Sequence, residues 1–147
     1  VTDDEISTAI LTLIEQQKLI AEGAGAVSVA AAMFNKVPVQ GKKVVCLVSG
    51  GNIDVTILSR VINRGLMKTG RSADITIALL DKPGQLSMIS DIIARKGGNV
   101  VAVHHDRADL DMDINACYLR LVMETRDYDH VEEIKKALTD AGFQIVK

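Results

Sequence analysis

The chain has 147 residues, of which 48% are hydrophobic, enough for one ordinary domain or two small ones with a buried core. Its formal net charge is −2, and its basic residues are scattered among acidic ones, which argues against the basic face that a nucleic-acid partner requires. No apolar run approaches the roughly 20 residues that span a bilayer. We therefore expect a globular protein with no nucleic-acid and no membrane partner.

Two cysteines, Cys46 and Cys117, lie in apolar runs with no second Cys or His at metal-ligand spacing. Buried, reduced thiols are the simplest interpretation, and they favour a cytoplasmic location. The chain begins with Val1 rather than Met, and we expect it to be part of a longer protein.

The first half predicts an α/β arrangement. A capping box at Thr2 and Glu5 begins a helix that continues to about Gln17. A short strand at 18–21 and an Ala-rich helix follow. The apolar run 44–48 is typical of a strand covered on both faces, and the turn after it leads into a helix that ends at Gly65. Two strands are too few for such a sheet, so residues 1–70 are predicted to be an incomplete α/β unit.

The polar connection at 67–72 predicts a domain boundary, and the pattern beyond it predicts the order β-α-β-β-α-β. The expected elements are a strand from Ala73 to Leu79, a helix from Leu86 to Ile93, strands from Asn99 to His105 and Cys117 to Met123, a helix from Val131 to Leu138 and a strand from Phe143 to Ile145. This order predicts a ferredoxin-like α+β domain over 73–147. Its four-stranded antiparallel sheet has both helices on one face, leaving an edge or the other face for a partner.

Each half resembles a known family. The stretch 22–26 (EGAGA), followed by 44–52 (VVCLVSGGN) and Asp54, resembles the end of the catalytic domain of the threonine and serine dehydratases, pyridoxal-phosphate enzymes of fold type II. The turn 81–86 (DKPGQL), with Gly98-Asn99-Val100, resembles an ACT domain. In this order the two stretches resemble the C-terminal part of a threonine dehydratase with a single ACT domain, and together they cover nearly the whole chain.

The dehydratase resemblance implies a cofactor contact in the turn that contains Ser49, Gly50 and Asn52. In that family a serine at this place donates a hydrogen bond to the pyridine nitrogen of pyridoxal phosphate, and a neutral hydroxyl suits an unprotonated ring nitrogen. The alternative is a tight strand-to-helix turn with Asn52 as a cap. The family's Schiff-base lysine motif and tetraglycine phosphate loop have no counterpart here. The resemblance therefore implies no catalytic residue in this chain and no cofactor bound to it alone.

The same resemblance implies a structural cation. Glu22 corresponds to the family's carboxylate ligand, with the Ala26 carbonyl and Ser28 nearby, and hard cations take several such oxygen ligands. Alternatively, Glu22 is a charge at a helix N-terminus that interacts with the backbone dipole.

The ACT resemblance implies an amino-acid effector bound between the loop after the first strand and the second strand of a neighbouring copy. It assigns the loop to Asp81, Pro83, Gly84, Gln85 and Leu86, and the opposing strand to Asn99 and Val100. Amide groups at a helix N-terminus suit a ligand carboxylate, and a glycine allows close approach. The alternative is that Pro-Gly simply starts a helix and Asn99 begins a strand. His104 and His105 face opposite sides of a strand and are interpreted as solvent or interface residues.

The leading hypothesis is thus the regulatory C-terminal portion of a threonine dehydratase, a lyase whose parent converts L-threonine to 2-oxobutanoate and ammonia. The ACT domain would sense isoleucine, valine or a similar amino acid and form a homo-oligomer. The alternative is a free-standing amino-acid-sensing or dimerisation module without an enzymatic parent. An RNA-binding ferredoxin-like domain needs exposed aromatic side chains on its sheet, and only 3% of residues are aromatic.

Overall fold

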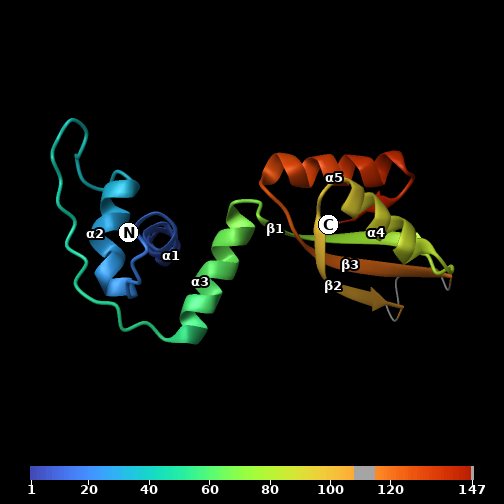
Figure 1. Cartoon of the computed structure of the whole chain (residues 1–147), viewed down its shortest axis with the longest axis horizontal. Helices are drawn as coiled ribbons and strands as arrows, with labels where there is room; N and C mark the ends of the chain where they lie inside the picture. Colours follow the sequence, from blue (N-terminus) through green and yellow to red (C-terminus); the bar gives the residue numbers. More distant parts are fainter. Residues whose placement is uncertain (108–114, 147) are drawn as a thin grey trace. The chain divides into compact units, whose positions relative to one another are not determined.

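A computed structural model describes residues 1–107 and 115–146 (Figure 1). The chain divides into two compact units, Val1–Gly65 and Leu66–Lys147, close to the boundary expected at 67–72. Each unit has its own apolar core. Within the described residues, no helix is both long enough and apolar enough to cross a membrane.

The first unit is built from helices. They are α1 (Asp3–Thr12), its π-helical continuation η1 (Leu13–Gln17), α2 (Gly23–Met33) and α3 (Val55–Lys68), which runs on into the second unit. The predicted capping box is confirmed, since the Glu5 amide donates to the Thr2 hydroxyl over 3.3 Å and the Thr2 amide donates to the Glu5 carboxylate over 2.8 Å. A small core lies between these helices, with Ala9, Ile10, Leu13, Ala21, Ala26, Ala30 and Val61 buried.

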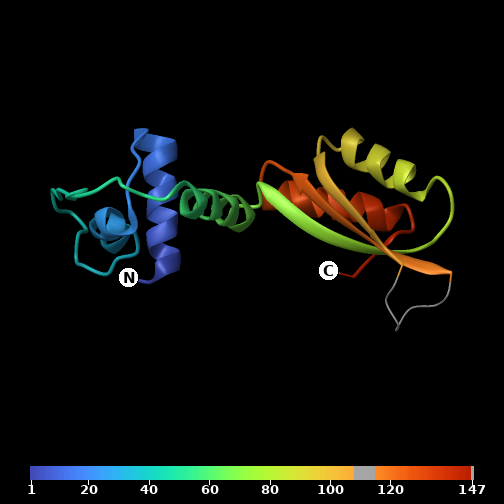
Figure 2. The ribbon, with the colours of Figure 1, turned by 90° about the horizontal axis from the view of Figure 1, so that it is seen from below.

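The two strands expected in the first unit are not formed. Residues 18–21 and 44–48 are extended segments without strand pairing, visible as the thin blue and teal trace in Figure 2. The side chain of Val45 is 96% exposed and that of Leu47 is 75% exposed. A strand is held by hydrogen bonds to a neighbouring strand, and the described part of this unit supplies none. The prediction of strands at 18–21 and 44–48 is therefore wrong for this unit, because its described residues form no sheet with which these segments could pair.

Helix α3 does not end at Gly65, as the sequence pattern predicts, but at Lys68. Gly65 instead allows close packing, because a β-carbon there would lie 2.2 Å from Cδ2 of Leu11. Two residues after Lys68, the chain leaves the helix through Gly70, whose φ of +68° favours glycine, and the Arg71 amide donates to the Leu66 carbonyl over 2.8 Å.

The second unit confirms the predicted β-α-β-β-α-β order. Its strands are β1 (Ser72–Leu80), β2 (Asn99–Asp106), β3 (Ala116–Glu124) and β4 (Gln144–Ile145), and its helices are α4 (Gln85–Arg95) and α5 (Tyr128–Asp140). The antiparallel sheet has the order β2-β3-β1-β4, which is the ferredoxin-like arrangement. Figure 1 shows both helices on one face of the sheet.

Side chains along β1 and β3 alternate between a buried face of the sheet and an open face. Ile75 pairs with Leu121 and Ile77 with Leu119, and these side chains pack beneath α4 and α5. Their neighbours point to the face without helices, where the Arg120 guanidinium forms a two-pronged ion pair with Asp74. Strand β2 is an edge strand, so one of its sides is unpaired within residues 1–107 and 115–146, and its register is irregular between Val100 and Ala102.

Candidate functional site

The loop between β1 and α4 forms a defined turn at one end of the sheet. The Asp81 amide donates to the Asn115 carbonyl over 2.8 Å, and the Lys82 amide donates to the Leu80 carbonyl over 2.9 Å. Gly84 precedes α4 with a φ of +91°, a conformation that side chains other than glycine rarely adopt. No side chain caps the N-terminus of α4. The first amides of the helix, at the positive end of its dipole, are therefore suited to an external acceptor.

This loop forms one wall of a cavity of about 410 Å³. All five loop residues that the sequence assigns to the effector site line it: Asp81, Pro83, Gly84, Gln85 and Leu86. Leu79 and Leu119 form its apolar base, while His105 and Arg107 enter from the end of β2. The volume lies within the range of small-ligand sites, and the mixture of apolar floor and few polar groups is typical of them.

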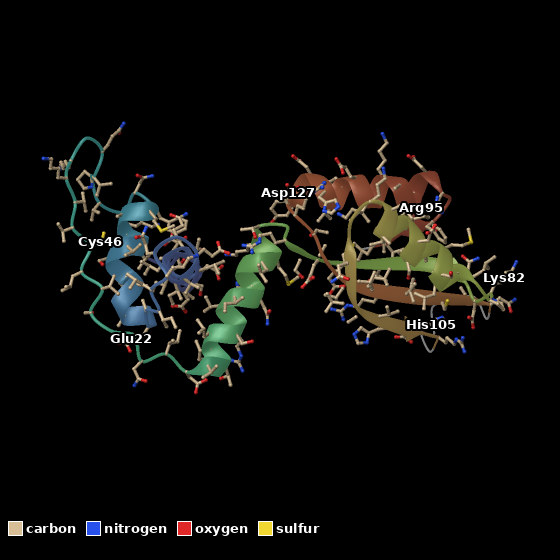
Figure 3. All side chains as sticks on the ribbon, viewed as in Figure 1. Glu22, Cys46, Lys82, Arg95, His105 and Asp127 are labelled. Carbon is tan, nitrogen blue, oxygen red and sulfur yellow. The ribbon has the colours of Figure 1, made fainter. Side chains whose placement is uncertain are left out.

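The charged groups of the cavity centre on Asp81. The Arg107 guanidinium contacts its carboxylate with Nε at 2.9 Å and a terminal nitrogen at 3.1 Å. His105 Nε2 lies 3.7 Å from the same carboxylate. Figure 3 shows His105 toward the end of the sheet where Lys82 begins the loop. The site thus holds one carboxylate between two cationic or potentially cationic side chains.

The thiol of Cys117 lies on the core side of this group and is fully buried. Burial raises the pKa of the thiol above its usual value, the Asp81 charge raises it further, and Arg107 opposes both effects. The thiol is therefore neutral in the absence of another cation. Cys117 is buried as the sequence predicts, whereas Cys46 is half-buried, with Sγ 3.7 Å from the Ser28 carbonyl.

Asn99 and Val100 are not at this cavity within one copy of the chain. Asn99 pairs with Glu124, at the end of the sheet where β1 begins rather than where it leads into the loop. The Asn99 amide donates to the Glu124 carboxylate over 2.9 Å. The two halves of the predicted effector site therefore lie at opposite ends of one sheet.

Sequence reasoning did not assign His105 and Arg107, which line the cavity, or Cys117, which lies beside Asp81, to this site. Arg107 is 26 residues from Asp81, and their side chains come together because β1 and β2 both pair with β3. The available signal was the two-residue periodicity of β2, which places His105 on the face opposite His104. Without the strand register, the sequence offered no reason to connect that face with Asp81.

In the first unit, the predicted cofactor turn packs tightly on the N-terminus of α2. The Glu22 amide donates to the Gly50 carbonyl over 3.0 Å, and a β-carbon on Gly50 would lie 2.5 Å from the Glu22 carboxylate. A β-carbon on Gly25 would lie 2.5 Å from the Gly50 carbonyl oxygen. Ser49 is exposed, while Asn52 and Glu22 line a separate cavity of about 590 Å³. The glycines of this turn are thus needed for close packing, and Ser49 has an accessible hydroxyl.

The residues predicted to hold a structural cation lie at and near the N-terminus of α2. The Ser28 hydroxyl donates to the Leu47 carbonyl over 2.8 Å. Ala26 is buried inside α2, where its amide donates to the Glu22 carbonyl over 3.1 Å. The Glu22 side chain, at the N-cap of α2, makes no capping hydrogen bond, and the alternative interaction with the helix dipole needs none. The cation assignment stays a prediction.

No protein-family model matches the chain. Over 145 residues, 99% of the chain, it is 46% identical to the L-threonine ammonia-lyase of Thermotoga maritima and 37% identical to that of Geobacter sulfurreducens. The chain corresponds to a segment of a threonine ammonia-lyase. The resemblance to the C-terminal part of a threonine dehydratase is thereby confirmed. The chain spans 36% of the length of each of these two relatives.

A shorter match extends the threonine ammonia-lyase relationship, and two solved structures are distantly similar. The biosynthetic L-threonine dehydratase of Lactococcus lactis is 32% identical over 84% of the chain and 30% of its own length. The ACT domain of the GTP pyrophosphokinase of Chlorobium tepidum matches 51% of the chain and 96% of its own length, at 16% identity and a TM-score of 0.39. Protein BT0572 of Bacteroides thetaiotaomicron matches 51% of the chain and 46% of its own, at 21% identity and a TM-score of 0.38. These structural likenesses are too weak to carry an argument, and the fold assignment rests on the strand order.

Proposed function

We propose that the chain is the regulatory C-terminal portion of a threonine ammonia-lyase and that its second unit binds a free amino acid at the β1–α4 loop. The observation that carries this proposal is the cavity of about 410 Å³, lined by all five loop residues assigned from the sequence, in a chain 46% identical to such a lyase over 145 residues. A ligand carboxylate would accept hydrogen bonds from the first amides of α4, near Gln85 and Leu86.

The remaining groups of an amino acid also find partners in this cavity. The ligand ammonium would contact the Asp81 carboxylate, taking part of the place that Arg107 holds. An aliphatic side chain would pack against Leu79, Leu86 and Leu119, which favours isoleucine or valine over polar amino acids.

A second copy of the chain would complete the site. Strand β2 is an edge strand, and antiparallel pairing of two copies of it with full overlap would bring Asn99 of one copy beside Asp106 of the other, next to the cavity residues His105 and Arg107. Such pairing accounts for the effector assignment of both the loop and the strand, although they lie at opposite ends of one sheet. We therefore propose a homo-oligomer that forms through the second unit.

The parent enzyme, in this proposal, converts L-threonine to 2-oxobutanoate and ammonia with pyridoxal phosphate. The cofactor supplies the electron sink for the elimination when it is bound. Ser49, with its accessible hydroxyl, would donate to the ring nitrogen, while the lysine and phosphate loop would come from the rest of the parent. In this proposal residues 1–70 are the C-terminal remnant of the parent's catalytic domain. This role also accounts for the exposed Val45 and Leu47, which a free-standing module would be expected to bury.

A thermal-shift screen of the chain against the twenty amino acids tests the sensing function. A ligand that binds only the folded state raises its apparent stability, by about 2.7 kcal/mol at a hundredfold excess over the dissociation constant. We expect isoleucine, valine or both to raise the melting temperature of the second unit, and glycine and aspartate to leave it unchanged. A flat response to all twenty amino acids would reject the effector site.

A further inference from the structure

Three side chains with metal-ligating atoms meet beside the effector cavity, two of which, Asp81 and His105, line it. They are Asp81, directly after β1, His105, near the end of β2, and Cys117, near the start of β3. One ligating atom of each lies within 4.8 Å of the others. The register explains the meeting, because Leu79 pairs with Cys117 and His105 with Leu119, which places all three side chains on the helix-covered face.

The chemistry of this set fits a particular class of ion. A thiolate, an imidazole and a carboxylate are ligands of Zn²⁺ and of similar divalent transition metals, whereas Ca²⁺ and Mg²⁺ prefer oxygen alone. With bonds of about 2.0 to 2.3 Å, neighbouring ligand atoms in a tetrahedral site are roughly 3 to 4 Å apart. The three ligating atoms, which lie within 4.8 Å of one another, need to approach by only about 1 Å to reach these distances. The side chains of Asp81 and His105 are 32% and 38% exposed and can rotate, while the buried Cys117 provides a fixed point.

We propose that Asp81, His105 and Cys117 form a binding site for a divalent transition metal ion of the Zn²⁺ class, with its fourth position open toward the effector cavity. The Cys117 thiol gives up its proton on binding, so that one thiolate and one carboxylate balance the charge of the ion. The site needs neither the proposed effector nor a second copy of the chain.

Arg107 has a defined part in this site. Its guanidinium contacts the Asp81 carboxylate and therefore competes with a metal ion for the same oxygens. The Arg107 side chain is 64% exposed, so it can leave for solvent when the ion arrives. The carboxylate is then paired with a cation in both states, with arginine in one and metal in the other. Removal of Arg107 should consequently strengthen metal binding, which a merely damaged fold would not do.

Titration of the full chain with Co²⁺, without any amino acid and with the thiols kept reduced, tests the proposal. We expect one Co²⁺ per chain, the charge-transfer absorption of a Co²⁺–thiolate bond, and displacement of Co²⁺ by Zn²⁺. Cys117→Ser should abolish the absorption band, while Cys46→Ser should retain it. His105→Ala should weaken Co²⁺ by more than the roughly 10- to 100-fold that loss of a ligand's hydrogen-bond partner causes, and His104→Ala, on the opposite face, should not.

Arg107→Ala should have the opposite effect and raise the affinity for Co²⁺ by on the order of tenfold. Circular dichroism of each variant shows whether it folds, and if Cys117→Ser does not, the two histidine variants and Arg107→Ala decide the question. The proposal is overturned if folded wild-type chain gives no thiolate band at millimolar Co²⁺, if the band follows Cys46, or if His104→Ala and His105→Ala weaken Co²⁺ equally.

Discussion

The buried imidazole of His130 bridges the two helices of the second unit, with Nε2 lying 2.8 Å from the carbonyl oxygen of Lys96. The Arg126 amide donates to Nδ1 over 3.1 Å, which requires that Nε2 carry the proton and donate to Lys96. One side chain therefore satisfies a carbonyl at the end of α4 and an amide before α5.

Replacement of His130 should destabilise the second unit. His130→Phe fills much of the space but leaves the Arg126 amide and the Lys96 carbonyl without their partner, and we expect a loss of about 2 to 4 kcal/mol in the free energy of unfolding. Urea unfolding measured by circular dichroism checks the value. Lys136→Ala, an exposed change on the same helix, should cost less than about 0.5 kcal/mol. Equal stability of the two variants would contradict the bridging role.

Gly84→Val should abolish effector binding. A β-carbon at Gly84 meets no atom of the chain within 4 Å, so any bulk it adds occupies the cavity mouth rather than the core. The φ of +91° adds backbone strain of about 1 to 2 kcal/mol. Calorimetric titration with isoleucine and valine measures the effect.

Gly142→Val is the matched control for that change. Gly142 has the same φ of +91° and the same open surroundings, but it follows α5 and does not line the effector cavity. It should lose similar stability and keep its affinity for the amino acid. If both variants bound isoleucine or valine as the wild type does, the ligand would have to sit elsewhere.

Asn99→Ala should weaken the effector without blocking its site. Loss of one side-chain hydrogen bond costs about 1 to 3 kcal/mol, which corresponds to a roughly 5- to 150-fold weaker ligand. Because Asn99 also donates to Glu124, Glu124→Ala is needed as a control that removes the same contact within the chain. If Glu124→Ala weakened the ligand as much as Asn99→Ala does, Asn99 would act through local structure rather than on the ligand.

Self-association should depend on the β2 edge. Val101 is 59% exposed at the irregularity of this strand, and a lysine on an edge strand opposes pairing with another chain. Val101→Lys should turn a dimer at micromolar concentration into a monomer, as measured by light scattering. Val146→Lys follows the opposite edge strand, β4, and should leave the dimer intact. A monomeric wild-type chain, or dissociation by Val146→Lys alone, would reject pairing through β2.

The chain by itself should not deaminate threonine. It has neither the Schiff-base lysine motif nor the phosphate loop of the family, so 2-oxobutanoate should form no faster with chain plus pyridoxal phosphate than with free cofactor.

Hydrogen exchange should also be fast at 44–48, because these residues have no strand partner in their own unit. Turnover above that of free cofactor, or strong protection at 44–48 in a proven monomer, would contradict the proposed remnant.

The sequence alone determined the architecture of the second unit. The two-residue alternation of Ile75 with Ile77 and of Leu119 with Leu121 marks half-buried strands, and the helical spacing of Ile89 and Ile93 marks the helix between them. These signals are local, because the side-chain direction repeats every two residues in a strand and every 3.6 in a helix. The loop residues could be named for the same reason, because a turn that leads into a helix is also marked by local residues such as glycine.

Only the tertiary structure decided the rest, because it depends on pairing between distant segments. An apolar run such as 44–48 becomes a strand only when another strand supplies its hydrogen bonds, and composition cannot say whether one is present. Gly65 and Gly70 look alike in sequence, yet one accommodates Leu11 and the other ends α3. The cluster of Asp81, His105 and Cys117 exists because strand register aligns three segments, and register is a property of the folded sheet rather than of any one strand.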